Sequence, residues 1–256
     1  MHVLLYPLML IALVGQGQLP DGAGGSFLYE PAYHLDSKLR GTPRPYCPQP
    51  GDIMMYTDSS IFWEITHDLA LAFQPHGSGM VVRRPDGTLG TLEAGPNDTY
   101  YVRVLDTLPH LKEYECKGPV WIRQRKTPLT PEQSEALTAF AMRQEWKKFA
   151  LIRLGGQLTP LRSRGPLRTW FLGKYKGERD SYFCSELVTT AGCAAGIIDV
   201  NTARPSATYP HDLFYDSSFN LYLNTHFSLA CGWEPPARWV SDISCSPCSP
   251  APETGK

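Results

Sequence analysis

Between Asp52 and Arg125 the chain is a succession of short apolar segments separated by turn residues. Runs of four to eight apolar residues bounded by Gly, Pro or Asp are typical of buried strands. The expected strands cover residues 52–56, 67–73, 80–83, 88–93, 100–104 and 120–125. An Asp86-Gly87 turn between two of these segments predicts a hairpin. Because most of the segments are sequential neighbours, we expect a largely antiparallel sheet.

Two helices are well marked in the second half of the chain. Thr130 precedes Pro131 and stands three residues before Gln133, which is a capping box with proline at the first helical position. A second helix is expected to begin near Cys184 and to stop at Gly196. Strands followed by sheet-packed helices predict an α+β fold.

Composition limits the class of protein. With 256 residues, 42% hydrophobic and 19% charged, the chain can bury one good core with extensions. We expect a lead-in over 18–49, a core domain over 50–214 and an extension with a Ser/Pro/Cys-rich tail over 215–256. The formal net charge of -1 gives no global field that would favour nucleic acid or an anionic membrane as the partner.

The amino terminus carries an almost unbroken apolar run from Val3 to Val14, followed by Gly15-Gln16-Gly17. The run is too short to span a bilayer, so we expect no stable membrane span. We interpret residues 1–17 as a signal peptide, which predicts a periplasmic, cell-envelope or extracellular location. No Lys or Arg precedes the run, and the alternative is a buried strand or helix.

The chain has seven cysteines, so in an oxidising compartment at least one thiol stays unpaired within the chain. Cys184 is the natural one to stay free. Cys245 and Cys248 have C-x-x-C spacing but lie in the tail without a second ligand pair, so a loose tail with a local disulfide is the expectation. We expect neither a metal site nor a cofactor.

Cys184 is the candidate nucleophile. At the start of a helix its thiolate is favoured by the positive end of the helix dipole, and a histidine from elsewhere can take its proton. A lone cysteine is more often a small core residue, but Cys184 stands beside polar Ser185 and Glu186. His67 is the candidate base, because an unperturbed imidazole is largely available as a proton acceptor near neutral pH, and His76, in a turn, is the reserve base.

Four segments occur in an order that resembles a known family. They are Pro50–Tyr56 (Pro-Gly-Asp and a strand), Thr66–Phe73 (Thr-His and a strand), Leu92–Ala94 (Leu-Glu-Ala) and Tyr182–Val188 (Tyr-Phe-Cys-Ser-Glu-Leu-Val). This order resembles the YiiX-like branch of the NlpC superfamily of papain-like cysteine hydrolases, over roughly residues 50–214. That branch is circularly permuted, with histidine before cysteine.

The resemblance implies a permuted papain-like core with Cys184 as nucleophile, His67 as base and Glu93 as the group that orients the imidazole. The chain departs from the family at His67-Asp68-Leu69, because the family usually has His-Val-Gly there. Leu69 in place of glycine changes the expected shape of the cleft. For Glu93 the alternative is a solvent-facing strand end.

Further residues are candidates for binding the substrate. A tetrahedral intermediate needs fixed donors, for which we expect the backbone N–H of Cys184 and the Tyr182 hydroxyl. Arg162, Arg164 and Arg168 precede the cysteine helix and are candidates for holding an anionic carboxylate or phosphate of the substrate. The alternative for these arginines is a solvated face.

Three functions remain open. The first is a thiol hydrolase that cleaves an amide bond in peptide or cell-wall material through an acyl-enzyme on Cys184. The second is ester or lipid acyl chemistry, as hydrolase or acyltransferase, on the same residues. The third is a non-catalytic binding module that keeps the fold. The first two share a nucleophile and a base, so the sequence does not separate them.

Overall fold

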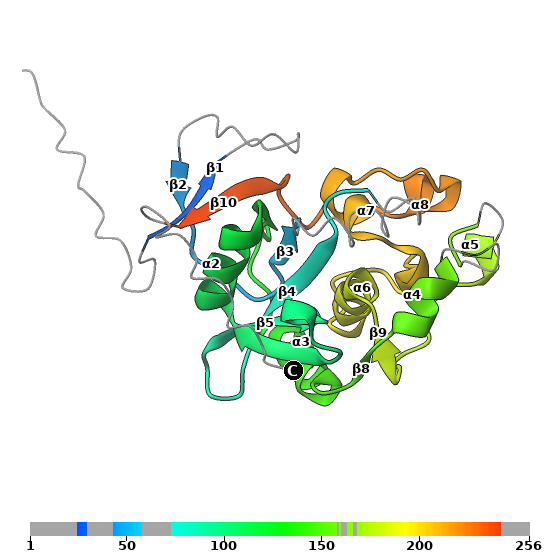
Figure 1. Cartoon of the computed structure of the whole chain (residues 1–256), viewed down its shortest axis with the longest axis horizontal. Helices are drawn as coiled ribbons and strands as arrows, with labels where there is room; N and C mark the ends of the chain where they lie inside the picture. The colour runs from blue at the N-terminus through cyan, green and yellow to red at the C-terminus, as the bar shows by residue number, and fades with distance from the viewer. Residues whose placement is uncertain are drawn as a thin grey trace, which may run out of the picture.

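A computed structural model describes residues 25–29, 43–57, 73–157, 159, 163–165 and 168–241. Over these ranges an eight-stranded sheet has the order β2-β1-β10-β7-β3-β4-β5-β6, and every neighbouring pair is antiparallel (Figure 1). Its strands are β1 (Ser26–Tyr29), β2 (Pro43–Pro45), β3 (Ile53–Tyr56), β4 (Gly77–Arg83), β5 (Leu89–Ala94), β6 (Val102–Asp106), β7 (Val120–Arg123) and β10 (Ala237–Ser241). Two short strands, β8 (Lys148–Phe149) and β9 (Ser181–Tyr182), pair in parallel beside it.

The hairpin of β4 and β5 follows from its turn residues. The Asp86 carboxylate accepts the backbone N–H of Thr88 at 2.9 Å, and Gly87 adopts φ 86°, a conformation that glycine takes at no steric cost. The resulting register pairs Met80 with Leu92. Successive side chains of a strand alternate between the two faces of the sheet, so the turn decides which residues of β5 face each core.

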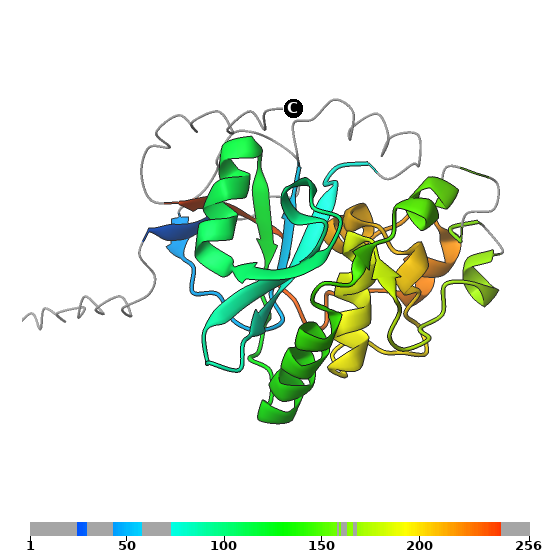
Figure 2. The ribbon, with the colours of Figure 1, turned by 60° about the horizontal axis from the view of Figure 1, so that its bottom comes forward.

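The sheet has a core on each face. Helices α3 (Pro131–Gln144) and α6 (Cys184–Ala194) pack on the face that carries Ile53, Met80 and Leu92. Helix α2 (Thr107–Lys117) covers the opposite face, with Met54, Tyr56 and Trp239. Figure 2 shows α2 on one side of the sheet and α3 and α6 on the other.

The remaining helices form a lobe beside the sheet (Figure 1). They are α4 (Leu151–Gln157), α5 (Arg168–Phe171), α7 (Pro210–Tyr215) and α8 (Leu221–His226). Single 3-10 turns occur at Pro96–Asp98, between β5 and β6, and at Pro205–Ala207, before α7. An α+β class with an antiparallel sheet is confirmed. No helix within the described ranges is long and apolar enough to cross a membrane.

Most of the predicted elements are present. The hairpin and the strands predicted at 52–56, 100–104 and 120–125 appear as β4–β5, β3, β6 and β7. The capping box of α3 is complete, with Thr130 accepting the N–H of Gln133, and the αL conformation of Gly196 follows the end of α6. The predicted strand over 67–73 lies outside the described residues except for Phe73, which is not in a strand.

Two predictions about the ends of the core need correction. The lead-in predicted as irregular supplies β1 and β2, and the extension after residue 214 supplies β10, which joins β1 to β7. Phe227, Leu229 and Trp233 also belong to the core on the α6 face. Weakly patterned segments form strands here because an existing sheet edge supplies their hydrogen-bond partners.

Candidate active site

Helix α6 begins at Cys184, where the chain leaves the β8–β9 pair. Phe183 is extended, with φ -99° and ψ 166°, and its side chain does not cap the helix. The helix buries Leu187, Val188 and Ala191 in the core on this face of the sheet. This packing fixes the N-terminal end of α6 beside β4, so the cysteine is held by the core and not by a flexible loop.

The Cys184 thiol lies against the start of β4. The residue is partly exposed, and Sγ is 3.7 Å from the carbonyl oxygen of His76, to which the thiol donates. Burial of the sulfur is the main cause of a Cys184 pKa raised to about 11; the negative charge of Glu93 adds to the rise, whereas the backbone N–H of Ser185 and the hydroxyl of Ser78 favour the thiolate. The resting thiol is therefore protonated at neutral pH and needs a base to become a nucleophile.

Glu93 lies buried on the α2 face of the sheet with three partners. The hydroxyls of Tyr56 and Tyr114 donate to Oε1 at 2.5 and 2.8 Å, and Nε2 of His110 lies 2.7 Å from Oε2. The rings of Tyr56 and Tyr114 stack with centroids 3.8 Å apart. A solvent-facing strand end is therefore excluded for Glu93, which is fully buried. Its predicted partner, His67, lies outside the described residues.

Gly77 makes room for Tyr56 next to the cysteine. The two residues are paired across β3 and β4, and a Cβ at position 77 would lie 2.0 Å from the Tyr56 ring. The backbone N–H of His76 donates to the Tyr56 carbonyl at 3.0 Å. The β3–β4 pair therefore brings Tyr56, Ser78 and the buried His76 to the cysteine, and Tyr56 links this group to Glu93.

The Tyr182 hydroxyl does not fit the predicted role of an oxyanion donor. Tyr182 is fully buried in β9; its hydroxyl donates to Gln144 at 3.1 Å and accepts the backbone N–H of Arg179 at 2.7 Å. Burial raises its pKa to about 12. The hydrogen bond to Gln144 holds the segment before α6 against α3, and the one from Arg179 lies within that segment, so the described contacts of the Tyr182 hydroxyl are structural.

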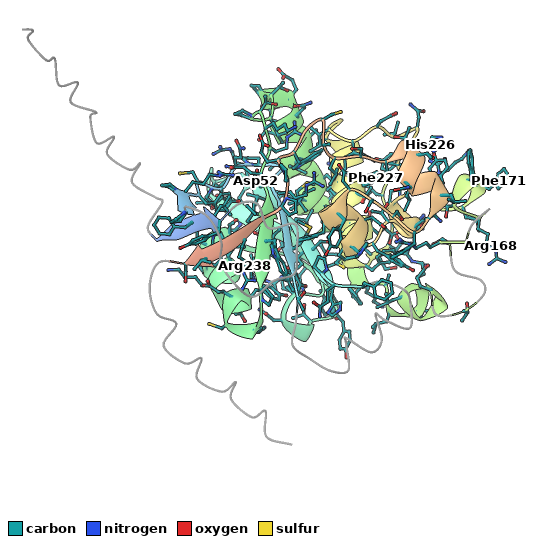
Figure 3. The ribbon with its side chains drawn as sticks, turned by 90° about the horizontal axis from the view of Figure 1, so that it is seen from above. Asp52, Arg168, Phe171, His226, Phe227 and Arg238 are labelled. Atoms are coloured by element: carbon teal, nitrogen blue, oxygen red, sulfur yellow. The ribbon has the colours of Figure 1, made fainter. Side chains whose placement is uncertain are left out.

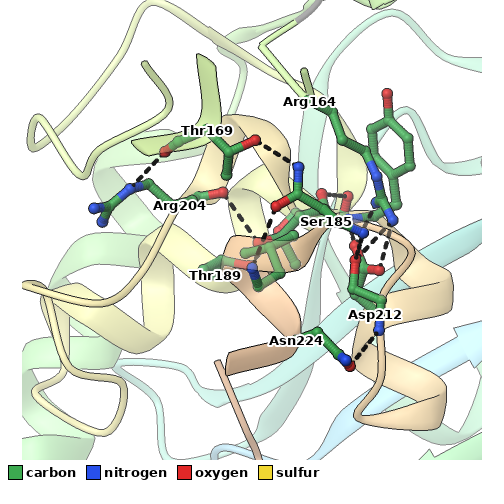
Figure 4. A network of polar contacts seen from close by, with 12 residues as sticks. Arg164, Thr169, Ser185, Thr189, Arg204, Asp212 and Asn224 are labelled. Carbon is green, nitrogen blue, oxygen red and sulfur yellow. Dashed lines mark hydrogen bonds and ion pairs between the residues drawn. The ribbon is translucent and has the colours of Figure 1, made fainter. Parts of the chain in front are cut away.

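Arg164 is likewise committed within the protein. Its guanidinium is buried and binds both carboxylate oxygens of Asp212, one at 2.8 Å, and Nη2 also donates to Ser218 at 2.9 Å (Figure 4). A bidentate pair of this kind leaves little capacity for a substrate anion. The described contacts of Arg164 are structural, and its predicted role in substrate binding stays a prediction. Arg168 begins α5 at the outer edge of the helical lobe (Figure 3) and Arg162 lies outside the described residues.

Sequence reasoning missed the residues around Glu93. His110 is not among the candidate residues of the sequence analysis, yet it is a partner of Glu93. Its spacing of four residues from Tyr114 on one helix face was a usable signal, since such residues are neighbours. The pairing of this face with Glu93 depends on how α2 packs on the sheet, which no local pattern encodes.

The next question is whether described His, Cys, Asp and Glu side chains are grouped closely enough to bind a metal ion. No group of three or more His, Cys, Asp or Glu side chains that could hold a metal ion occurs among the described residues. Cys116 is disulfide-bonded, whereas Cys47, Cys184, Cys193 and Cys231 are free thiols. Cys193 is buried near the C-terminal end of α6, so Cys184 is the better exposed thiol of this helix.

Comparison with known proteins finds similarity among solved structures only. No family model matches the chain, and no curated protein matches it. Among solved structures it is similar to the metalloprotein yiiX from Escherichia coli O157:H7 (DUF1105), with 22% identity and a TM-score of 0.41. The match covers 59% of this chain and 67% of that one.

Proposed function

We propose that this protein is a thiol-dependent hydrolase with a permuted papain-like core, in which Cys184 forms an acyl-enzyme. One observation carries the proposal: a partly exposed cysteine opens a core-anchored helix, and its thiol lies against the start of β4, 3.7 Å from the His76 carbonyl oxygen. A purely structural cysteine needs no such surroundings. The leading substrate class is an amide in peptide or cell-wall material.

The reaction has two steps. A histidine takes the Sγ proton while Sγ attacks the carbonyl carbon, and the backbone N–H of Cys184 stabilises the oxyanion. The bond to the leaving group breaks as that group takes the proton from the histidine, which leaves a thioester on Cys184. Water then attacks the thioester, gives a proton to the histidine and releases the acid, and the thiol is restored.

The base comes from the segment that leads into β4. His67 is the residue that the resemblance favours, and His76 is the residue whose backbone contacts the thiol. We assign Glu93 as the group that orients this base. It lies on the face of the sheet opposite to α6 and is hydrogen-bonded to Tyr56. A buried carboxylate with three hydrogen bonds stays in a fixed orientation, as the third member of such a site requires.

Single-residue variants test the assignment. We expect Cys184→Ala to abolish labelling by activity-based thiol probes and turnover of amide and ester substrates. The free energy of unfolding should change by less than ~2 kcal/mol. His67→Ala and His76→Ala should differ, and the inactive one identifies the base. Cys193→Ala is the control, because it removes the other thiol of α6. Turnover that survives Cys184→Ala would overturn the proposal.

Ester or lipid acyl chemistry is the second candidate. It is favoured by a specific observation: large apolar side chains are exposed on the helical lobe, starting at Phe73, three residues before His76. A peptide hydrolase has no need of such a surface outside its cleft.

A further inference from the structure

Six large apolar side chains are exposed on one lobe of the molecule. They come from the segment that leads into β4, from α5 and the residue after it, and from α8 and the chain just before it, and we refer to them as the α5–α8 apolar face. Their exposed fractions are 38% for Phe73, 45% for Trp170, 77% for Phe171, 46% for Leu172, 74% for Phe219 and 72% for Leu221. Aromatic and leucine side chains at this degree of exposure mark an interaction surface when they are contiguous.

Ring contacts link the three segments that carry these residues. Trp170 of α5 packs edge-on against Tyr222 and His226 of α8, with centroids 4.9 and 5.3 Å apart. Phe219, just before α8, packs against Phe73 with centroids 5.8 Å apart. Figure 3 shows Phe171 and His226 at the same end of the molecule. The face therefore runs from the end of the lobe to the segment beside Cys184.

The charge of these segments has one sign. Residues 168–177 hold Arg168, Lys174 and Lys176 and no acid, and residues 217–226 hold neither acid nor Lys nor Arg. Both lysines are exposed. Elsewhere on the chain the acids exceed the bases by four, because 21 Lys and Arg remain against 25 Asp and Glu. Exposed aromatic and leucine side chains flanked by lysines are the composition of surfaces that sit in the headgroup region of an anionic bilayer.

We propose that the α5–α8 apolar face docks on an anionic lipid bilayer, and that the acyl esters of bilayer lipids are the substrate class of Cys184. The second part rests on the proposed role of Cys184 as nucleophile and selects the second candidate substrate class, lipid acyl esters, over the amide. The apolar side chains enter the headgroup region, the lysines contact anionic headgroups, and the end of the face at Phe73 brings the thiol near the lipid. The near-neutral net charge is compatible with this, because the attraction is local and acts within a Debye length.

Co-sedimentation with vesicles tests the docking without any need for turnover. The full-length Cys184→Ala protein is mixed with vesicles of 30% phosphatidylglycerol in phosphatidylcholine, and with phosphatidylcholine alone. We expect binding to the anionic vesicles, weaker binding at high salt, and a loss of about tenfold in Phe171→Ser/Leu221→Ser and in Lys174→Glu/Lys176→Glu. The matched control is Tyr100→Ser/Val200→Ser, which removes exposed apolar side chains elsewhere and should bind like the parent.

Other outcomes would overturn the proposal. Binding that survives in Phe171→Ser/Leu221→Ser would place the lipid contact elsewhere in the chain. Equal binding to neutral vesicles would show that anionic lipid is not required. No binding, together with a dimer on size-exclusion chromatography that these two substitutions dissociate, would make the face a self-association surface. Because the protein carries Cys184→Ala, none of these results depends on whether Cys184 is a nucleophile. The substrate class is tested separately, by turnover of short-chain phospholipid esters with Cys184 intact.

Discussion

The surroundings of Cys184 hold its thiol in the protonated form. Burial dominates, and the charge of Glu93 acts in the same direction. In the proposed mechanism the same carboxylate also orients the base, so one residue has two opposing effects on the nucleophile. The two effects can be separated experimentally, because one changes the thiol pKa and the other changes turnover.

Replacing Glu93 by Gln removes the charge and keeps the hydrogen bonds. The amide oxygen can accept from Tyr56 and Tyr114, and the amide nitrogen can donate to His110 in the tautomer with a free Nε2. We expect the pKa of Cys184 to fall below about 11 and its alkylation by iodoacetamide at pH 8 to rise about three- to tenfold, since each pKa unit changes the thiolate fraction tenfold. Turnover should fall while some activity remains.

The measurement is the rate of adduct formation at Cys184 by mass spectrometry between pH 7 and 11. Glu132→Gln is the control, because Glu132 is an exposed acid at the start of α3. Slower alkylation in Glu93→Gln than in the wild type would show that the carboxylate activates the thiol, contrary to this prediction.

At the scale of elements, a buried ion pair holds the helical lobe together, and a hydrogen bond joins the lobe to the cysteine helix. Arg164, which lies before α5, binds Asp212 of α7, and Asp212 also accepts the backbone N–H of Tyr209 at 2.8 Å as part of a capping box. Ser185 of α6 donates to the carbonyl of Thr208 at 2.7 Å, so the chain entering α7 is bound to the first turn of the cysteine helix (Figure 4).

Asp212→Asn should destabilise the protein by about 3 kcal/mol, because it leaves the Arg164 charge buried without its counter-ion. Urea denaturation measures the change. Arg143→Gln is the control, since it breaks the exposed pair with Glu178 and should cost less than about 1 kcal/mol. In Arg164→Gln we likewise expect lower stability with an unchanged KM. A raised KM with full stability would restore the substrate-binding role that the sequence predicted.

The sequence predicted elements better than it predicted contacts. The capping box at Thr130 and the start of α6 at Cys184 are local patterns, and both are confirmed. The partners of Glu93 and Arg164 come from residues 17 and 48 positions away, and they meet only once α2 and α7 have packed. A charged residue in an isolated segment looks available to a ligand, and only the tertiary packing shows that it is already paired.

At the scale of the whole molecule, disulfide formation bears on the compartment. Cys116 of α2 is disulfide-bonded, and such bonds persist in oxidising compartments. We therefore propose that the protein is exported, as its apolar amino terminus predicts. Material purified from its native source should show fewer than seven thiols by thiol titration in denaturant, and all seven after reduction. Its amino terminus should lie near Gln18. An intact Met1 with seven free thiols would contradict export.

The sheet also depends on chain outside the predicted domain of 50–214. Strand β10 pairs with β7 on one side and β1 on the other, and Trp233 donates from Nε1 to the Gly51 carbonyl at 2.8 Å within the core. Removing residues 215–241 would expose the β7 edge and leave a cavity where Phe227, Leu229 and Trp233 pack. Loss of each buried side chain of this size costs about 2–5 kcal/mol, and a domain is stable by only about 5–15 kcal/mol.

A fragment of residues 50–214 should therefore fail to fold, whereas a chain ending at Ser241 should unfold cooperatively. Far-ultraviolet circular dichroism during thermal denaturation distinguishes the two. The single substitution Trp233→Ala refines the test. It should lower the midpoint temperature without abolishing cooperativity, because β10 still pairs with β1 and β7. A cooperative transition in the 50–214 fragment would show that the predicted boundary is a true domain boundary and that the last strand adds only to the edge.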